Sequence, residues 1–260
     1  MARLGGSAEV IYLGEAHDNP HHHARQARVL SALLAGGRRP ALALEMLAAP
    51  QQAALDEALA ARVAMPELER RLGWRERGWP DFSLYWPLFQ LAREHGVPVL
   101  AIDLDQAVAR RIACGGLASV GEERVALASR LTPDAERERR IAHTIRTAHC
   151  DLMPERRIPA MVESWHARNV TMARGLSGAL DRIAQVVVIV GRGHQDPGGL
   201  PAQLETLRPG TRQLIVDMLE APAGERPEEV VRRANGEVVW ITPAVERPDP
   251  CEGLRRRLRG

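Results

Sequence analysis

Five short apolar runs, each bounded by turn residues, constrain the fold of this chain more than any other feature of its sequence. The runs do not alternate apolar with polar residues, so they are typical of strands that are covered on both faces. A sixth run, residues 238–242, is expected to add an edge strand. The five runs are residues 10–14, 41–45, 98–104, 186–191 and 214–218.

Helical patterns separate these runs, and strands that alternate with helices predict an α/β fold. We expect a mostly parallel central sheet with helices on both faces. No strand is predicted between residues 105 and 181, which indicates a helical excursion between two sheet strands. One domain over residues 1–245 and a basic, mobile tail over 246–260 follow from this. The expected helices are residues 21–35, 51–62, 66–72, 87–95, 133–150 and 159–181.

Charge and composition exclude several classes of protein. The 35 basic and 33 acidic residues nearly cancel, to a net charge of +2, so no nucleic-acid partner is expected. No apolar run approaches the roughly 20 residues that span a bilayer, and the first ten residues lack the apolar region of a secretion signal. We therefore expect a cytoplasmic protein. Cys114, Cys150 and Cys251 form no CxxC pair and are predicted to be mostly buried thiols without a disulfide framework.

Polar residues interrupt the apolar runs at their C-terminal ends. In an open parallel sheet these ends lie along one edge, where ligands bind. We therefore predict that residues far apart in the sequence meet in a single polar cleft. They are Glu15, His17, Glu45, Asp103, Asp105 and His194.

Imidazole and carboxylate groups have two chemical uses in such a cleft. His17, Glu45 and His194 would be suitable ligands for a divalent metal ion, with a position left open for water or substrate. Without a metal, the same groups would serve as general acid and base. Two plainer alternatives stay open, since a carboxylate at a strand end often caps the next helix, and a single loop histidine such as His194 is often only hydrogen-bonded.

Three consecutive histidines follow the first run. Asp18 or Asn19 is expected to cap the helix, with Pro20 at its first position. The three histidines then face different directions. His21 is four residues beyond His17 and is the one expected to join it, whereas His22 and His23 are expected to be exposed to solvent.

The aromatic residues are few and crowded. The chain has five Trp, two Tyr and two Phe, and six of these nine lie between residues 74 and 89. The spacing of Phe82, Tyr85, Trp86 and Phe89 favours ordinary helix packing. Prolines 80 and 87 interrupt a long helix, so an aromatic surface for a planar cofactor or a second subunit is the alternative. Tyr85 stands out, because phenolate is a known axial ligand of haem iron.

At these residues the chain resembles the ChaN-like branch of the haem-binding uptake and TIKI superfamily, which is distantly related to the erythromycin esterases. The resemblance covers roughly the first 200 residues. The matching segments are LGEAHDNPHHH (13–23), LALEM (42–46), ERGWPDFSLYWPLF (76–89), GVPVLAIDL (96–104), HCDLMPERRIPAMVESWHARNVTMA (149–173) and VVIVGRGH (187–194).

The resemblance implies an α/β sandwich that binds haem in connection with iron uptake, often as a lipoprotein and a homodimer. The haem contacts would come from His17, His21, Tyr85, Trp86 and His194. In the TIKI proteases the matching glutamates and histidines are implicated in metal-dependent peptide hydrolysis. The alternative function is therefore a metal-dependent hydrolase, and its catalytic residues would be Glu15, His17, Glu45 and His194.

Two departures from the family pattern bear on these expectations. The chain shows no lipoprotein signal with an acylated cysteine, so membrane association is expected only if an N-terminal segment is missing. Trp165 and Asn169 stand where relatives commonly have Gln and Asp, which weakens a mechanism that needs a carboxylate there. Haem binding is the preferred hypothesis, and a non-catalytic relative that keeps only the fold is a third.

Overall fold

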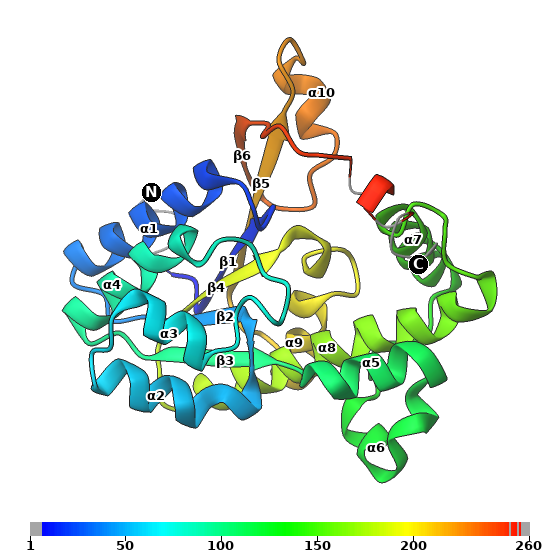
Figure 1. Ribbon diagram of the computed structural model, residues 1–260, viewed down its shortest axis with the longest axis horizontal. Coiled ribbons are helices and arrows are strands. Elements are labelled where there is room, and N and C mark those ends of the chain that lie inside the picture. Colours follow the sequence, from blue (N-terminus) through cyan, green and yellow to red (C-terminus); the bar gives the residue numbers. More distant parts are fainter. Residues whose placement is uncertain (1–6, 250, 254, 256–260) are drawn as a thin grey trace.

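Six parallel strands form the centre of the molecule (Figure 1). The computed structural model describes residues 7–249, 251–253 and 255. Every pair of neighbouring strands is parallel, in the order β3-β2-β4-β1-β5-β6, so the predicted parallel sheet and its edge strand are confirmed. The strands are β1 (Val10–Glu15), β2 (Ala41–Ala48), β3 (Val99–Asp103), β4 (Val186–Gly191), β5 (Gln213–Ala221) and β6 (Val238–Pro243).

Helices cover both faces of this sheet, because successive side chains of each strand point to opposite faces. On β1, Ile11 and Leu13 pack into one core cluster, and Val10 and Tyr12 pack into the other. The first cluster is covered by α1 (Pro20–Ala35), α2 (Gln52–Ala60), α3 (Met65–Arg71), η2 (Phe82–Leu84) and α4 (Trp86–His95). The short η1 (Ala49–Gln51) connects β2 to α2. The second is covered by α8 (Ile158–Ala179) and α9 (Leu200–Leu207).

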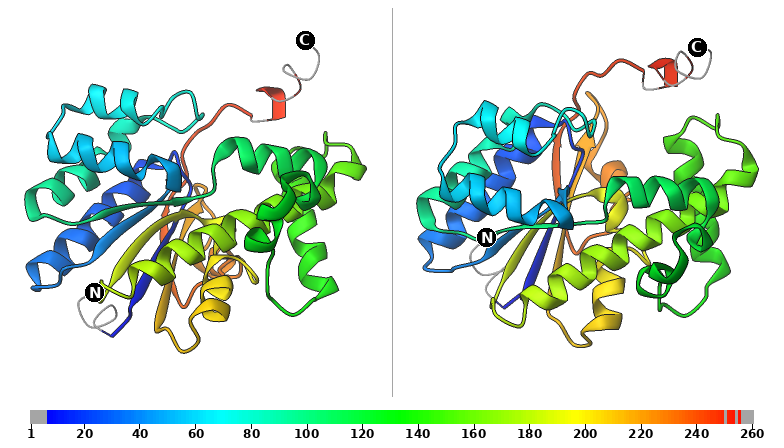
Figure 2. Two further views of the ribbon diagram at one scale, coloured as in Figure 1. Left: turned by 90° about the horizontal axis from the view of Figure 1, so that it is seen from below. Right: turned by 60° about the horizontal axis from the view of Figure 1, so that its bottom comes forward.

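The predicted helical excursion connects β3 to β4. It carries its own small core, in which Leu104 and Ile112 pack against Ala167 of α8. Figure 2 shows the green helices of residues 106–148 beside the sheet, away from α1 and α4. The excursion contains α5 (Gln106–Gly115), η3 (Leu117–Glu123), α6 (Arg124–Leu127), α7 (Ala135–Ala148), η4 (Glu155–Arg157) and α8; η5 (Arg192–His194) follows β4, and α10 (Pro227–Val231) follows β5.

The expectation for the cysteines is wrong. Cys150 and Cys251 form a disulfide, and Cys114 is exposed. Cys150 lies in the turn after α7, where its φ of 60° places it in the left-handed region. Its partner is 101 residues away, so no spacing motif announces the pair. The structure describes part of the predicted mobile tail, namely residues 246–249, 251–253 and 255. The disulfide links this part to the turn after α7. Residues 250, 254 and 256–260 of the tail lie outside the described residues.

Candidate functional site

Four side chains meet at the carboxyl edge of the sheet, and we define them as the acid–imidazole cluster: Glu15, His17, Glu45 and His194. Its members come from the ends of β1, β2 and β4, which are neighbours in the sheet. His17 Nδ1 lies 2.8 Å from Glu15 Oε1, and its Nε2 lies 3.9 Å from Glu45 Oε2. His194 Nε2 lies 3.2 Å from the other oxygen of Glu45. Glu45 therefore stands between the two imidazoles.

A local irregularity of β2 places Glu45 in this position. The pairing of β2 with β4 ends at Leu44, and its pairing with β3 resumes only at Ala48. Glu45 follows this break, and its Oε2 accepts a hydrogen bond of 2.6 Å from the backbone N–H of Gly191. A Cβ atom at Gly191 would lie 2.7 Å from His17 Nε2. Glycine at 191 thus allows both the hydrogen bond and the close approach of His17.

Arg168, on α8, neutralises part of the acidic charge. Its guanidinium donates hydrogen bonds to Glu45 Oε1 at 2.8 Å and to Asp103 Oδ2 at 2.7 Å. Both carboxylates are almost fully buried. Buried carboxylates need a charged partner, so a nearby arginine was foreseeable in principle. Sequence reasoning identified Asp103 but did not identify Arg168.

The charges shift the pKa values of the cluster. Burial by itself raises the pKa of Glu45, but the imidazoles of His194 and His17 and the Arg168 guanidinium outweigh burial and hold it well below 4.5. Burial lowers the pKa of His17, and the carboxylates of Glu45 and Glu15 outweigh this effect and raise it above 6.5. The arrangement therefore favours ionised glutamates beside a His17 that holds its proton more strongly than a free imidazole.

Asn169 and Trp165 orient His194 from α8. Asn169 Oδ1 accepts a hydrogen bond of 2.9 Å from His194 Nδ1, and the Trp165 ring stacks parallel to the His194 ring, with centroids 6.1 Å apart. The side-chain amide of Asn169 is in turn fixed by the carbonyl of Trp165 at 2.8 Å. The two departures from the family pattern thus lie directly against the cluster. An amide at position 169 orients the imidazole without adding a charge.

Tyr85 is part of the core. Its side chain is fully buried, and its hydroxyl donates a hydrogen bond of 2.6 Å to Glu15 Oε1. Trp74 packs edge to face on Tyr85 with ring centroids 4.9 Å apart, so the packing interpretation of the aromatic segment is confirmed. Burial, followed by the charge of Glu15, raises the pKa of Tyr85 well above 10. Trp86, at the start of α4, is half-buried, and the Arg93 guanidinium lies 4.6 Å from its ring centroid.

Two expectations for the histidine run are wrong. His22 and His23 are buried rather than exposed, and the exposed residue is His21. His22 Nδ1 accepts a hydrogen bond of 2.9 Å from the backbone of Ala16, and its Nε2 lies 2.8 Å from Thr242 Oγ1. His23 Nε2 lies 2.8 Å from the carbonyl oxygen of His17, so both rings face the turn that follows β1.

The cap of α1 is as predicted. Asn19 is the N-cap and its side chain accepts a hydrogen bond from the backbone of His21, with Pro20 at the first helical position. Asp105, by contrast, is not a member of the cluster. It caps α5 by accepting hydrogen bonds from the backbone of Ala107 and Val108. The plainer alternative, a carboxylate that caps a helix, is therefore right for Asp105 and wrong for Glu45.

The predicted metal ligands His17, Glu45 and His194 meet, but as a hydrogen-bonded ionic cluster. Both oxygens of Glu45 already accept hydrogen bonds, one from Arg168 and one from Gly191. Within the described part of the chain, no group of three or more His, Cys, Asp or Glu side chains has an arrangement that could hold a metal ion. The geometry thus contains no preformed metal site at this edge of the sheet.

The sequence profile described as "Haem-binding uptake, Tiki superfamily, ChaN" matches residues 1–204. No curated protein sequence matches the chain. Among solved structures, ChaN of Campylobacter jejuni, whose description is of cofacial haem binding, is 21% identical; the match has a TM-score of 0.64 and covers 85% of this chain and 84% of that one. At this identity the likeness shows a shared fold.

Two further solved structures share the fold. One, from Bacillus cereus, is 13% identical with a TM-score of 0.52, and the match covers 86% of this chain and 70% of that chain. The other is a mutant of the erythromycin esterase EreC in its open conformation, 16% identical with a TM-score of 0.50, over 85% of this chain and 72% of that chain. The distant relation to erythromycin esterases that the sequence indicated is thus visible in the fold.

Proposed function

The chain belongs to the ChaN family of the haem-binding uptake, Tiki superfamily, and on this premise we propose that it binds haem and takes part in haem or iron handling. The observation that carries the proposal is the extent of the match. Residues 1–204 include every strand end and helix that contributes to the acid–imidazole cluster, from Glu15 to His194. Haem would supply an iron centre, and a side chain of the protein would hold it.

His17 is the residue of the predicted haem-contact set that best fits such a ligand. Its side chain is 29% exposed and belongs to the cluster, whereas that of His194 is 7% exposed and Tyr85 is fully buried. His21 is also exposed, but it is not a member of the cluster.

Glu15 holds Nδ1 of His17, so Nε2 is the nitrogen that would bind a metal once it has lost its proton, an arrangement common among metal-binding histidines. The edge of the Trp79 indole lies against the same imidazole, with ring centroids 5.0 Å apart. An imidazole beside an aromatic ring is suited to a planar, largely apolar cofactor.

Titration of the purified protein with haemin, followed by its Soret band, tests this proposal. We expect saturable binding that His17→Ala weakens at least tenfold, with a shift of the Soret maximum. His95→Ala is the matched control, because His95 is exposed at the end of α4 and lies outside the cluster. Absence of a saturable Soret change in the wild-type protein would overturn haem binding. Loss of the band in Tyr85→Phe, with His17→Ala unchanged, would move the iron ligand to Tyr85.

A homodimer is part of the same proposal. Haem binding to ChaN of Campylobacter jejuni is described as cofacial. We extend this arrangement to one haem on each of two copies of the present chain. Light scattering coupled to size-exclusion chromatography, with and without haemin, tests it: a mass that stays at one chain after loading would contradict the dimer.

The location of the protein is a separate proposal. Disulfides persist in oxidising compartments and are rare in the cytoplasm, so the Cys150–Cys251 pair favours an exported protein over the cytoplasmic one expected from the N-terminal sequence. No helix of the described residues is both long and apolar enough to cross a bilayer. Fractionation of cells that produce the protein, with a cytoplasmic enzyme as marker, distinguishes the two locations.

A further inference from the structure

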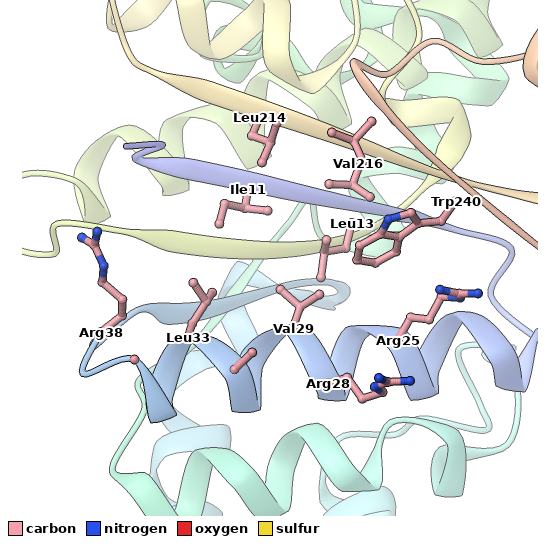
Figure 3. Close-up of a pocket in the computed structure, with 13 residues that line it drawn as sticks. Ile11, Leu13, Arg25, Arg28, Val29, Leu33, Arg38, Leu214, Val216 and Trp240 are labelled. Atoms are coloured by element: carbon pink, nitrogen blue, oxygen red, sulfur yellow. The ribbon is translucent and has the colours of Figure 1, made fainter. Parts of the chain in front are cut away.

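A cavity lies between α1 and the sheet, on the side of β5 and β6 (Figure 3). Its volume is about 520 Å³, within the range of small-molecule sites. It shares no lining residue with the acid–imidazole cluster. The apolar part of its wall consists of Ile11, Leu13, Leu214, Val216, Val238 and Trp240 from the strands and Val29, Ala32 and Leu33 from α1.

The topology explains why this space is open. Leu13 pairs with Val216 in the neighbouring strand, and Val216 pairs with Val238 in the next, so their side chains form one continuous apolar face across β1, β5 and β6. Leu13 and Val216 are buried under α1, whereas Val238 and Trp240 at the sheet edge are only partly buried. The groove thus lies between α1 and the three strands β1, β5 and β6, and its least buried strand residues are at the sheet edge.

The charged groups of the cavity all have one sign. Arg25, Arg28 and Arg38 are among its thirteen lining residues, and none of the thirteen is acidic. The Arg25 guanidinium lies 5.7 Å from the Trp240 ring centroid, and Arg28 follows one turn later on α1. Figure 3 shows these two arginines at one end of the groove and Arg38 at the other. An apolar groove with guanidinium groups at its ends is complementary to an amphiphile with an anionic head.

We propose that this groove binds a medium-chain aliphatic carboxylate, with its tail along α1 and its head at Arg25 and Arg28. The planar guanidinium forms paired hydrogen bonds with a carboxylate, and the apolar strand face buries a chain of methylene groups. Haem is not the ligand of this groove, since none of its lining residues is a His, Cys, Tyr or Met that would bind the iron. The inference therefore goes beyond the proposed function.

Calorimetric titration with decanoate, below its micellar concentration, tests the proposal. We expect saturable binding of one decanoate per chain and no binding of decyltrimethylammonium, which carries the opposite charge on the same tail. Ala32→Trp fills the groove and is expected to abolish binding. Ser31→Trp is its matched control, because Ser31 is exposed on the same helix but is not a lining residue. Both positions are exposed, so neither indole has to enter the core.

The arginines are tested in the same titration. We expect the double variant Arg25→Gln, Arg28→Gln to weaken decanoate binding about tenfold or more, and Arg39→Gln, an exposed neighbour of the groove, to leave it unchanged. Three results would overturn the proposal. They are equal affinities for decanoate and decyltrimethylammonium, an affinity of Ala32→Trp for decanoate equal to that of the wild-type protein, and the absence of saturable heat. A dimer in solution that Ala32→Trp dissociates, without decanoate binding, would assign the groove to a second copy of the chain instead.

Discussion

The Tyr85 hydroxyl donates a hydrogen bond of 2.6 Å to Glu15 Oε1, so the aromatic segment before α4 is joined to the end of the first strand. Both side chains are buried, and Glu15 is further held by His17 and by the amide of Gln26. Tyr85 therefore supports the residue that orients His17. If the protein binds haem as proposed, we expect Tyr85 to affect binding indirectly, through the position of the glutamate.

Tyr85→Phe tests this role. The substitution removes one hydrogen bond to a buried carboxylate, and we expect it to lower the free energy of unfolding by about 2 kcal/mol. Tyr12→Phe is a matched control, because Tyr12 is also buried and donates to the neutral Gln213 Oε1 at 2.6 Å. We expect Tyr12→Phe to lower the free energy of unfolding by about 1 kcal/mol. Urea denaturation of both variants makes the comparison, and equal losses would contradict a special contribution of the charged acceptor.

Gly191→Ala tests the packing of His17 against the sheet. The backbone of Gly191 has a φ of −62°, which alanine adopts without strain, so the effect is steric. The new Cβ would lie 2.7 Å from His17 Nε2 and 3.3 Å from Glu45 Oε2. We expect a loss of about 1–3 kcal/mol of stability and a displaced imidazole. Thermal denaturation and the NMR signals of the His17 ring measure these effects.

Gly193→Ala provides the control for that experiment, since a Cβ there would meet no atom within 4 Å. It lies two residues further along the same loop and should leave both stability and the His17 signals nearly unchanged. If Gly191→Ala behaved in the same way as Gly193→Ala, the close approach of His17 to the end of β4 would be refuted.

Arg168→Met tests the charge balance of the cluster. The variant leaves Glu45 and Asp103 buried without their common cation, and breaking a buried ion pair in this way costs about 3–5 kcal/mol. Arg174→Met, at an exposed position on the same helix, should cost less than about 0.5 kcal/mol. Chemical denaturation at neutral pH gives both values. A loss below 1 kcal/mol for Arg168→Met would show that the two carboxylates do not depend on it.

His22 predicts how stability depends on pH. Burial lowers the pKa of the His22 imidazole from 6.5 to about 4. The ring is held between the backbone N–H of Ala16 and the hydroxyl of Thr242. In the unfolded chain, the His22 imidazole takes up a proton below pH 6.5. In the folded protein, the same imidazole stays neutral down to about pH 4. Stability should therefore fall by about 3 kcal/mol as the pH decreases through this window.

Denaturation midpoints measured between pH 7 and pH 4 give the slope of stability against pH. We expect His22→Gln to reduce it, and His21→Gln, which changes an exposed ring on the same turn, to leave it unchanged. The glutamates of the cluster contribute at lower pH, because their pKa values lie below 4.5 and their stabilisation is lost only as the pH falls through those values. An unaltered slope in His22→Gln would contradict the assignment.

The sequence predicted the sheet and the meeting point of its polar residues because both follow from local patterns. A strand buried on both faces needs an unbroken apolar run, and the carboxyl ends of parallel strands necessarily share an edge. Glu15, His17, Glu45 and His194 are each adjacent to such a run. Their convergence needed no information about loops or distant contacts.

What the sequence did not predict depends on contacts between distant segments. His22 is buried because Thr242, 220 residues later, lies against its ring, and no periodicity of α1 contains that information. The ion pairs of Arg168 also depend on distant segments, because its two carboxylate partners, Glu45 and Asp103, come from different strands. The Cys150–Cys251 disulfide likewise joins residues that are far apart in the sequence. Only the assembled sheet edge determines which polar groups are paired there.

The disulfide gives the last prediction. Of the three cysteines, Cys150 and Cys251 are bonded and Cys114 is exposed, so one thiol per chain should react with an alkylating reagent in the denatured, unreduced protein and three after reduction. Mass spectrometry counts the labels directly. Cys114→Ser should carry no label before reduction and two labels after it. Cys251→Ser should carry two labels without any reductant, because Cys150 is then free. Three labels on the unreduced wild-type protein would refute the bond and, with it, the support for an oxidising compartment.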